Sequence, residues 1–193
     1  HYVLETLFSP FIDRFDEHGR RISGKVVTED DLLNMEKEVP LLVSKSFELH
    51  FSEDRNSWQT GTNHINFEVA KEMVQNVLRR DRAILKENPQ KALFILGLER
   101  RLETLIPITP DSDPTKRIEV RLSGICDRID QFDGVHRIID YKSGSVSQDK
   151  VELKKTANQE SYEEAILTNR RKGNSMQKHV LQLVIYCYLY YKE

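Results

Sequence analysis

Several stretches of the chain carry apolar residues every three to four positions, a spacing that predicts amphipathic helices. The predicted helices span residues 1–15, 29–43, 67–86, 159–171 and 176–192. Pro10 is expected to kink or divide the first helix. The second predicted segment, 29–43, forms one helix or two short ones, and Pro40 marks the expected irregularity within it. Asn88-Pro89 should end the third.

The middle of the chain changes to β-prone runs separated by turn residues. Predicted strands cover residues 93–96, 102–108, 118–132 and 135–141, and predicted turns or loops cover 16–20, 53–63, 110–114 and 172–175. An order of helices, then strands, then helices is typical of an α+β or mixed α/β protein. We therefore predict a sheet between helical layers.

The dipeptide Asp133-Gly134 joins the last two predicted strands and is a strong signal for a two-residue type I′ turn. In the register that this turn sets, Asp127 faces Asp140, with Cβ atoms about 4.5–5.5 Å apart. Lys142 lies two residues beyond Asp140 and therefore on the same face. One face of the hairpin thus offers two carboxylates and an ammonium group.

Two facing carboxylates repel each other, and a cation between them reverses the sign of that interaction. Asp127 and Asp140 suit Mg²⁺ or Mn²⁺, which bind carboxylate oxygens, keep bound waters and accept phosphate oxygens. Lys142 could orient or deprotonate a water molecule, or stabilise charge that develops on phosphorus. The alternative is a solvated hairpin face with a Lys–Asp pair, and a single bulge would change the register.

Composition narrows the classes of protein that remain. The 193 residues suffice for one domain or two small ones, and their net charge of −2 means that nucleic acid would need a local basic face. Cys126 and Cys187 are too few for a disulfide scaffold, an all-cysteine zinc site or a four-cysteine iron–sulfur cluster. We expect both to be buried free thiols in a reducing compartment. No apolar run is long enough to span a membrane, no signal peptide is recognisable, and the chain begins with His1, so we expect a piece of a longer protein.

Four motifs, in order, resemble those of PD-(D/E)XK nucleases, and most closely the RecB/AddB-type nuclease domain of bacterial helicase–nuclease complexes. Gly124-Ile-Cys-Asp127-Arg-Ile-Asp130 is similar to the family pattern G-x-x-D-R-x-D, and Ile138-Ile-Asp140-Tyr-Lys142-Ser-Gly144 contains D-Y-K-[ST]-G. Gln182-Leu-Val-Ile-Tyr186 fits Q-x-x-x-Y. His1-Tyr-Val-Leu4-Glu5 resembles the opening helix pattern G-x-x-x-H-x-x-L-E without its leading glycine. The likeness extends from residue 1 to about residue 190.

The resemblance implies a role for each matching position. The implied metal ligands are Asp127, Asp140, the backbone carbonyl of Tyr141, and His1. Lys142 would be the catalytic lysine, acting with Asp127 and Asp140. Gln182 and Tyr186 would brace the site or approach the DNA backbone.

The same resemblance implies a restriction-endonuclease-like α/β fold, a mixed central sheet flanked by helices, in a single nuclease domain over residues 1–193 from the C-terminal part of a larger protein. The expected reaction is hydrolysis of DNA phosphodiester bonds with Mg²⁺ or Mn²⁺ and no iron–sulfur cluster, by an exonuclease of double-strand-break repair. Expected partners are DNA and a helicase domain or subunit, in the bacterial cytoplasm and away from membranes. The alternative is a catalytically inactive nuclease-like module that binds DNA or a helicase partner.

Three acidic residues near the motifs have two interpretations each. Glu99 could reach the same site from a neighbouring strand, or pair with an adjacent arginine at the surface. Glu5 lies one helical turn from His1 and could assist it or interact with the helix dipole. Asp130 is expected to be the structural partner of Arg137, which faces it, or of Arg128.

Three basic clusters, at residues 79–82, 150–155 and 170–172, could follow DNA phosphates. The first is more readily explained as a solvated helix face. The other two follow the predicted hairpin in sequence and are the better candidates for DNA contact.

Overall fold

The computed structural model describes residues 1–12, 14–15, 21–22, 24–144, 146 and 178–193. The chain forms two compact units, one of residues 1–99 and 127–139 and the other of residues 100–126 and 140–193. The predicted turn at 16–20, helix at 159–171 and break at 172–175 lie outside the described residues. The single domain expected over the whole chain stays a prediction.

The amino-terminal segment contains a shorter helix than its apolar spacing predicts. Its elements are α1 (Tyr2–Phe8), the 3-10 turn η1 (Ser9–Phe11), β1 (Arg14–Phe15) and β2 (Arg21–Ile22). The prediction that Pro10 divides the helix is confirmed, because α1 ends before it. Helix up to residue 15 is wrong, since Ile12 instead forms a parallel bridge with Ile95 of the sheet.

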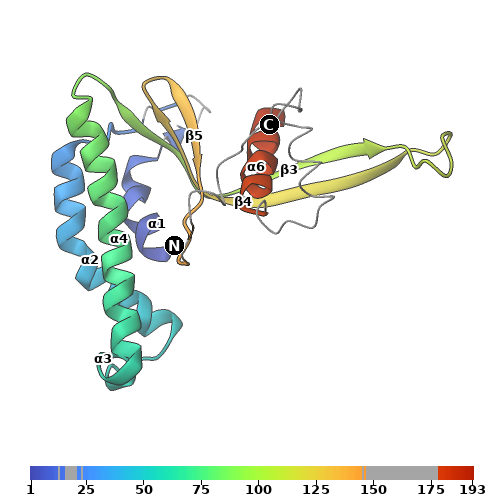
Figure 1. Cartoon of the computed structure of the whole chain (residues 1–193). Coiled ribbons are helices and arrows are strands. Elements are labelled where there is room, and N and C mark those ends of the chain that lie inside the picture. Colours follow the sequence, from blue (N-terminus) through green and yellow to red (C-terminus); the bar gives the residue numbers. More distant parts are fainter. Residues whose placement is uncertain (13, 16–20, 23, 145, 147–177) are drawn as a thin grey trace, which may run out of the picture. The chain divides into compact units, whose positions relative to one another are not determined.

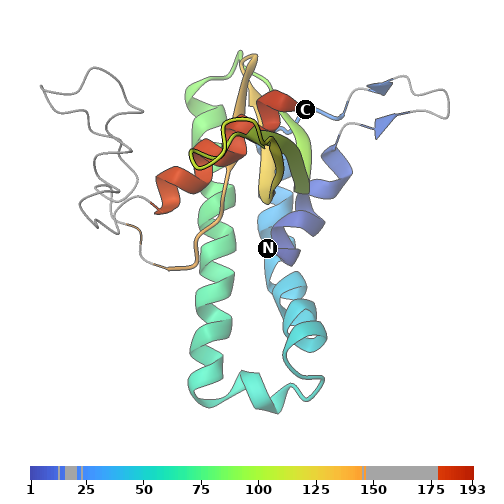
Figure 2. The same cartoon turned by 90° about the vertical axis from the view of Figure 1, so that its right-hand side faces the viewer.

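Two long helices lie side by side in the first unit (Figures 1 and 2). The elements are α2 (Glu29–His50), the short α3 (Asn56–Gln59) and α4 (Gly61–Glu87). Helix α2 begins at a capping box, in which the Thr28 hydroxyl accepts from the Asp31 backbone N–H and the Asp31 carboxylate accepts from the Thr28 N–H. Of the two alternatives predicted for residues 29–43, one helix is confirmed, and Pro40 lies inside it without ending it. Val39 and Leu42, on either side of it, are both buried, and packing against α4 outweighs the hydrogen bond that proline removes.

Helix α4 confirms the helix predicted over residues 67–86 and its end at Asn88. The segment 53–63, predicted as a loop, is partly helical, because α3 and the start of α4 lie in it. Trp58 accounts for this difference. Its side chain is fully buried, and its ring centroid lies 5.0 Å from that of Phe67 in α4. One large apolar anchor therefore holds a short helix in an otherwise polar segment.

An antiparallel sheet contains three strands in the order β3-β4-β5, namely β3 (Leu93–Ile108), β4 (Ile118–Phe132) and β5 (Val135–Ile139). The predicted hairpin is confirmed from the pair Phe132–Val135 to the pair Arg128–Ile139. Asp133 and Gly134 have φ angles of 54° and 78°, as a type I′ turn requires. The mixed α/β architecture, with helices flanking the sheet, is the restriction-endonuclease-like class that the sequence predicts.

Strand lengths differ from the prediction in two places. Strand β3 is continuous where two strands, 93–96 and 102–108, are predicted. Strand β5 ends at Ile139, two residues before the predicted end at Tyr141. The turn predicted at 110–114 is confirmed as the connection between β3 and β4.

The second unit contains α6 (Lys178–Lys192), which falls within the helix predicted over residues 176–192 and lies across β3 and β4 (Figure 1). Its Tyr186 ring is buried against Gly124 of β4. Cys126 is buried and is not part of a disulfide, as predicted. The prediction is wrong for Cys187, which is exposed because it follows Tyr186 on α6 and points away from the packed side.

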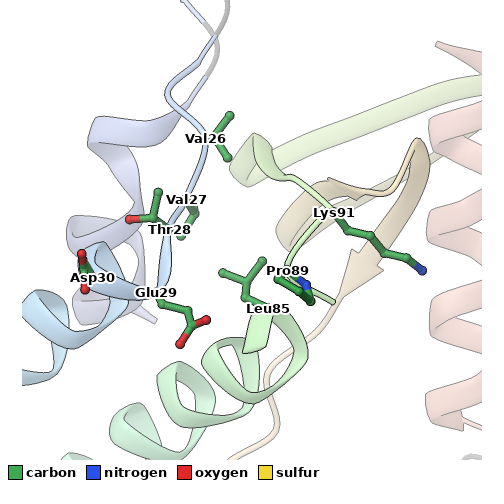
Figure 3. Close-up of a pocket in the computed structure, with 8 residues that line it drawn as sticks. All are labelled: Val26, Val27, Thr28, Glu29, Asp30, Leu85, Pro89 and Lys91. Carbon is green, nitrogen blue, oxygen red and sulfur yellow. The ribbon is translucent and has the colours of Figure 1, made fainter. Parts of the chain in front are cut away.

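None of the described helices is long and apolar enough to cross a membrane. A pocket of about 520 Å³ opens in the first unit beside the start of α2 (Figure 3). It is lined by Val26, Val27, Thr28, Glu29, Asp30, Leu85, Pro89 and Lys91. None of the residues that the sequence assigns to a catalytic or metal site lines this pocket.

Candidate active site

Three possible metal ligands meet in the first unit, each from a different element. His1 is the N-cap of α1, Glu99 lies in β3, and Asp127 lies in β4. The His1 Nδ1 atom is 3.2 Å from Glu99 Oε1 and 3.3 Å from Asp127 Oδ1. One ligand atom from each of the three residues lies within 4.8 Å of the other two. The cluster therefore converges closely enough for a single ion to contact all three.

Local structure fixes the position of each member. Helix α1 is held down by buried apolar side chains, including Leu4 and Leu7, which places His1 at its fixed end. Asp127 is 7% exposed and lies within a stretch of β4 in which every residue from Cys126 to Asp130 is buried. Burial of consecutive residues means that both faces of this part of the sheet are covered.

Glu99 has an unusual backbone conformation for a strand residue. Its φ angle is 45°, in the left-handed region that side chains other than glycine rarely adopt. A local irregularity of this kind re-aims a side chain, and such irregularities concentrate at functional sites. Here the carboxylate is directed at His1. Glu99 therefore contacts His1 within the cluster, and its role in a functional site stays a prediction.

The carboxylate form of Glu99 is disfavoured in this structure. The pKa of Glu99 is raised, first by burial and then by the negative charges of Asp127 and Glu5. Each of these effects disfavours the carboxylate form. A cation among these oxygens would offset the repulsion, so the electrostatics favour a bound ion.

The donor set fits a divalent metal. One imidazole nitrogen and two carboxylate oxygens form a partial coordination sphere of mainly hard ligands. Mg²⁺ and Mn²⁺ accept such ligands and retain positions for water and phosphate oxygens. The residues present therefore suit the ion that the sequence predicts.

A second group of predicted residues meets in the second unit. The Lys142 ammonium lies 2.5 Å from Asp140 Oδ2 and donates to Gln182 Oε1 at 3.0 Å. The Gln182 amide in turn donates to the Tyr186 hydroxyl at 2.8 Å. Gln182 and Tyr186 are four residues apart on α6 and therefore share a helix face. The amide thus links the lysine to the buried tyrosine.

Two of the predictions for the hairpin stay predictions. Tyr141 follows Asp140 beyond the end of β5 and is partly buried, and a role for its carbonyl stays a prediction. The described ladder ends at the pair Arg128–Ile139. The next pair that the same register gives, Asp127 with Asp140, stays a prediction.

Asp130 is a structural residue, as predicted. Arg137 Nε donates to Asp130 Oδ1 at 2.7 Å, and Arg128 Nη2 lies 2.8 Å from Asp130 Oδ2. The sequence does not indicate the second acidic partner of Arg128, which is Asp81 of α4. Asp81 lies inside the basic cluster 79–82, where a lone acidic residue among arginines could have been noticed.

Among the residues that the structure describes, the predicted basic clusters provide little uncompensated positive charge for binding DNA. In the cluster at 79–82, Arg79 pairs with Glu72 and Arg82 with Glu36, each at 2.8 Å. Their charges are thus compensated within the protein, as expected for a solvated helix face. The clusters at 150–155 and 170–172 lie outside the described residues.

Several classes of protein contain metal sites of this kind, and comparison with known protein families identifies the class of this chain. The model of the PD-(D/E)XK nuclease superfamily matches residues 1–193, which is the whole chain. The chain belongs to the PD-(D/E)XK nuclease superfamily. Members of this superfamily are nucleases that hydrolyse phosphodiester bonds and generally depend on divalent metals. No curated protein and no solved structure matches the chain.

Membership in the superfamily agrees with the sequence resemblance at the level of the superfamily. It also gives the three converging residues of the first unit a chemical context, because nucleases of this superfamily generally use divalent metals.

Proposed function

We propose that this chain is a divalent-metal-dependent deoxyribonuclease. One observation carries the proposal: in a chain of the PD-(D/E)XK superfamily, His1, Glu99 and Asp127 bring one nitrogen and two carboxylate oxygens within 4.8 Å of one another. A solvated surface would leave the carboxylates apart, because like charges that converge without a cation destabilise a fold. Burial first, and then the negative charges of Asp127 and Glu5, raise the pKa of Glu99.

The metal ligands that we propose from the first unit are His1, Glu99 and Asp127. The family resemblance adds Asp140 and the Tyr141 carbonyl. Mg²⁺ or Mn²⁺, when bound, would polarise the scissile phosphodiester and lower the pKa of a water molecule. The chain's own residues hold and orient the reactants. Asp140 and Gln182 fix the Lys142 ammonium, which can then align the attacking water or neutralise charge on the phosphate.

We assign both groups of residues to one reaction because the motifs of one family pattern contain every member of the two groups except Glu99. The motifs at 124–130 and 138–144 supply the two aspartates and the lysine, and the motif at 182–186 supplies the residues that hold the lysine. All the residues with chemical roles are present in their expected types. This favours an active enzyme over a nuclease-like module that only binds DNA or a helicase partner.

The finer features of the proposal rest on the resemblance alone. They are an exonuclease mode, a RecB/AddB-type origin in the C-terminal part of a helicase–nuclease protein, a role in double-strand-break repair, a helicase partner and a bacterial cytoplasmic location. Within this proposal the substrate is the end of a DNA duplex or of one of its strands.

Cleavage of two DNA substrates tests the proposal. End-labelled linear DNA and closed-circular DNA are incubated with the protein and Mg²⁺ or Mn²⁺, with Lys142→Ala as the blank and Lys116→Ala, an exposed lysine of the same unit, as the matched control. We expect the wild type and Lys116→Ala to degrade linear DNA only and Lys142→Ala to degrade neither. Cutting of circles would replace the exonuclease mode with an endonuclease mode. A folded wild type that binds DNA without metal-dependent cleavage would overturn the enzyme proposal in favour of a binding module.

A further inference from the structure

A buried ion cluster lies beside the three proposed metal ligands of the first unit. The guanidinium of Arg128, the residue after Asp127, is 1% exposed. It donates to Asp81 of α4 through Nη1 at 2.7 Å and through Nη2 at 3.1 Å, and its Nη2 also lies 2.8 Å from Asp130. Arg137 completes the cluster by donating two hydrogen bonds to Asp130. The four formal charges cancel.

A buried ion cluster of this kind is weak evidence for a role in stability alone. Replacing a buried ion pair with apolar residues of similar volume is often neutral or stabilising, because desolvation of the charges opposes their attraction. Breaking such a pair on one side is strongly destabilising. A bidentate arginine–carboxylate pair gives directional specificity, which apolar packing does not.

Arg128 also contacts the helix that carries His1. Its guanidinium carbon lies 4.8 Å from the centre of the Phe8 ring, and Phe8 is the fully buried last residue of α1. His1, at the other end of α1, contacts Asp127. Helix α1 is therefore held against β4 at both ends, by consecutive residues of the strand. Asp81 fixes the same guanidinium to α4.

We propose that Arg128, held by Asp81, is a positioning residue for the metal site: it fixes α1 to β4 so that the His1 imidazole and the Asp127 carboxylate stay at ligating distance. This inference rests on the proposed function, because it assumes that His1 and Asp127 bind a metal. Arg128 itself touches neither the ion nor the substrate. It acts through the ends of α1 and through the neighbouring residue in the strand.

Mn²⁺ affinity of the folded protein, measured by calorimetry or electron paramagnetic resonance, tests this role without relying on nuclease activity. Arg128→Lys keeps the charge and removes the bidentate geometry. We expect it to weaken Mn²⁺ binding roughly 10–100-fold, as loss of a residue that orients a metal ligand does. The matched control is Arg82→Lys, which alters an ion pair between α4 and α2, one residue from Asp81. We expect this control to bind Mn²⁺ within about twofold of the wild type.

Phe8→Leu provides a second variant in case Arg128→Lys does not fold. It keeps an apolar side chain and all the charges, and removes only the ring that the guanidinium contacts. We expect several-fold weaker Mn²⁺ binding with an unchanged circular dichroism spectrum. Folded Arg128→Lys or Phe8→Leu protein with wild-type Mn²⁺ affinity would overturn the positioning role and leave the proposed function intact. A folded wild type whose Mn²⁺ binding is undetectable, or insensitive to Asp127→Ala, would overturn both.

Discussion

Gly124 of β4 leaves the space that the Tyr186 ring of α6 occupies. A Cβ atom built on Gly124 would lie 2.4 Å from Tyr186 Cε1 and 3.1 Å from its Cδ1. Both distances are shorter than an ordinary van der Waals contact, so only glycine at this position accommodates the ring. The same tyrosine accepts a hydrogen bond from Gln182, which holds Lys142. The absence of one methyl group on β4 therefore helps to determine where the proposed catalytic lysine lies.

Gly124→Ala should displace the Tyr186 ring and destabilise the protein by about 1–3 kcal/mol, the usual cost of overpacking. Nuclease activity should fall as well, because Gln182 is hydrogen-bonded to both Tyr186 and Lys142, and a shift of the Tyr186 ring should therefore displace the lysine. Urea unfolding and DNA cleavage measure the two effects. Gly144→Ala is the control, since a Cβ there meets no atom within 4 Å. In a Tyr186→Leu background the cost of Gly124→Ala should shrink, and an undiminished cost would contradict the steric explanation.

Asp127→Ala should weaken Mn²⁺ binding by at least about tenfold, because it removes a buried carboxylate from the proposed ligand set. Cleavage should be lost as well. Calorimetric titration of Mn²⁺ into the metal-free protein measures the affinity. Asp111→Ala, an exposed residue in the turn between β3 and β4, is the control for loss of one negative charge. Full Mn²⁺ affinity in folded Asp127→Ala protein would show that the ligand assignment is wrong.

Glu99→Gln should have opposite effects on stability and on metal binding. At neutral pH the metal-free variant should melt a few degrees higher than the wild type, since one carboxylate is removed from a place where burial, Asp127 and Glu5 raise its pKa. Its Mn²⁺ affinity should fall. Thermal melts with and without Mn²⁺ test both effects, with Glu103→Gln on the same strand as the control. A lower melting temperature without metal would argue against electrostatic strain at Glu99.

The capping box of α2 should make stability depend on pH. Burial opposes ionisation of Asp31, but hydrogen bonds from Lys25 and Thr28 outweigh it and lower the pKa of Asp31 below its ordinary value of 3.8. Because this pKa is lowered, the contribution of the ionised Asp31 side chain to stability is complete above pH 3.8. That contribution is lost as the pH falls through the pKa of Asp31 in the folded protein. Asp31→Ala should therefore cost about 1 kcal/mol at pH 7 and progressively less below pH 4.

Urea unfolding at pH 7, 5 and 3 measures this dependence. Asp30→Ala is the control, because Asp30 lies in the same first turn of α2 but outside the capping box. The loss of stability in Asp30→Ala should come from the helix dipole alone and should be smaller than that in Asp31→Ala. A difference between the wild type and Asp31→Ala that stays constant over this range would contradict the assignment of the carboxylate as the cap.

Local sequence signals predicted those parts of the fold that depend on neighbouring residues. The Asp133-Gly134 turn and the register from Phe132–Val135 to Arg128–Ile139 follow from a two-residue loop whose geometry permits one pairing. The end of α4 at Asn88 follows from the proline after it. Local signals do not suffice where packing between distant segments decides the outcome. Pro40 lies inside α2 because its neighbours are buried against α4, and Trp58 holds a helix in a segment whose other residues favour a loop.

By itself the sequence predicted the nuclease superfamily to which this protein belongs, and the motifs at 124–130, 138–144 and 182–186 contain the carboxylates, the lysine and the glutamine and tyrosine to which we assign its chemistry. Only the tertiary structure decided that Glu99 joins His1 and Asp127, because this depends on a left-handed backbone at one residue of β3. It also decided that Asp81 of α4 is a partner of Arg128. Residue type and spacing encode which atoms can react, whereas contacts between residues far apart in sequence form only when helices and strands pack together.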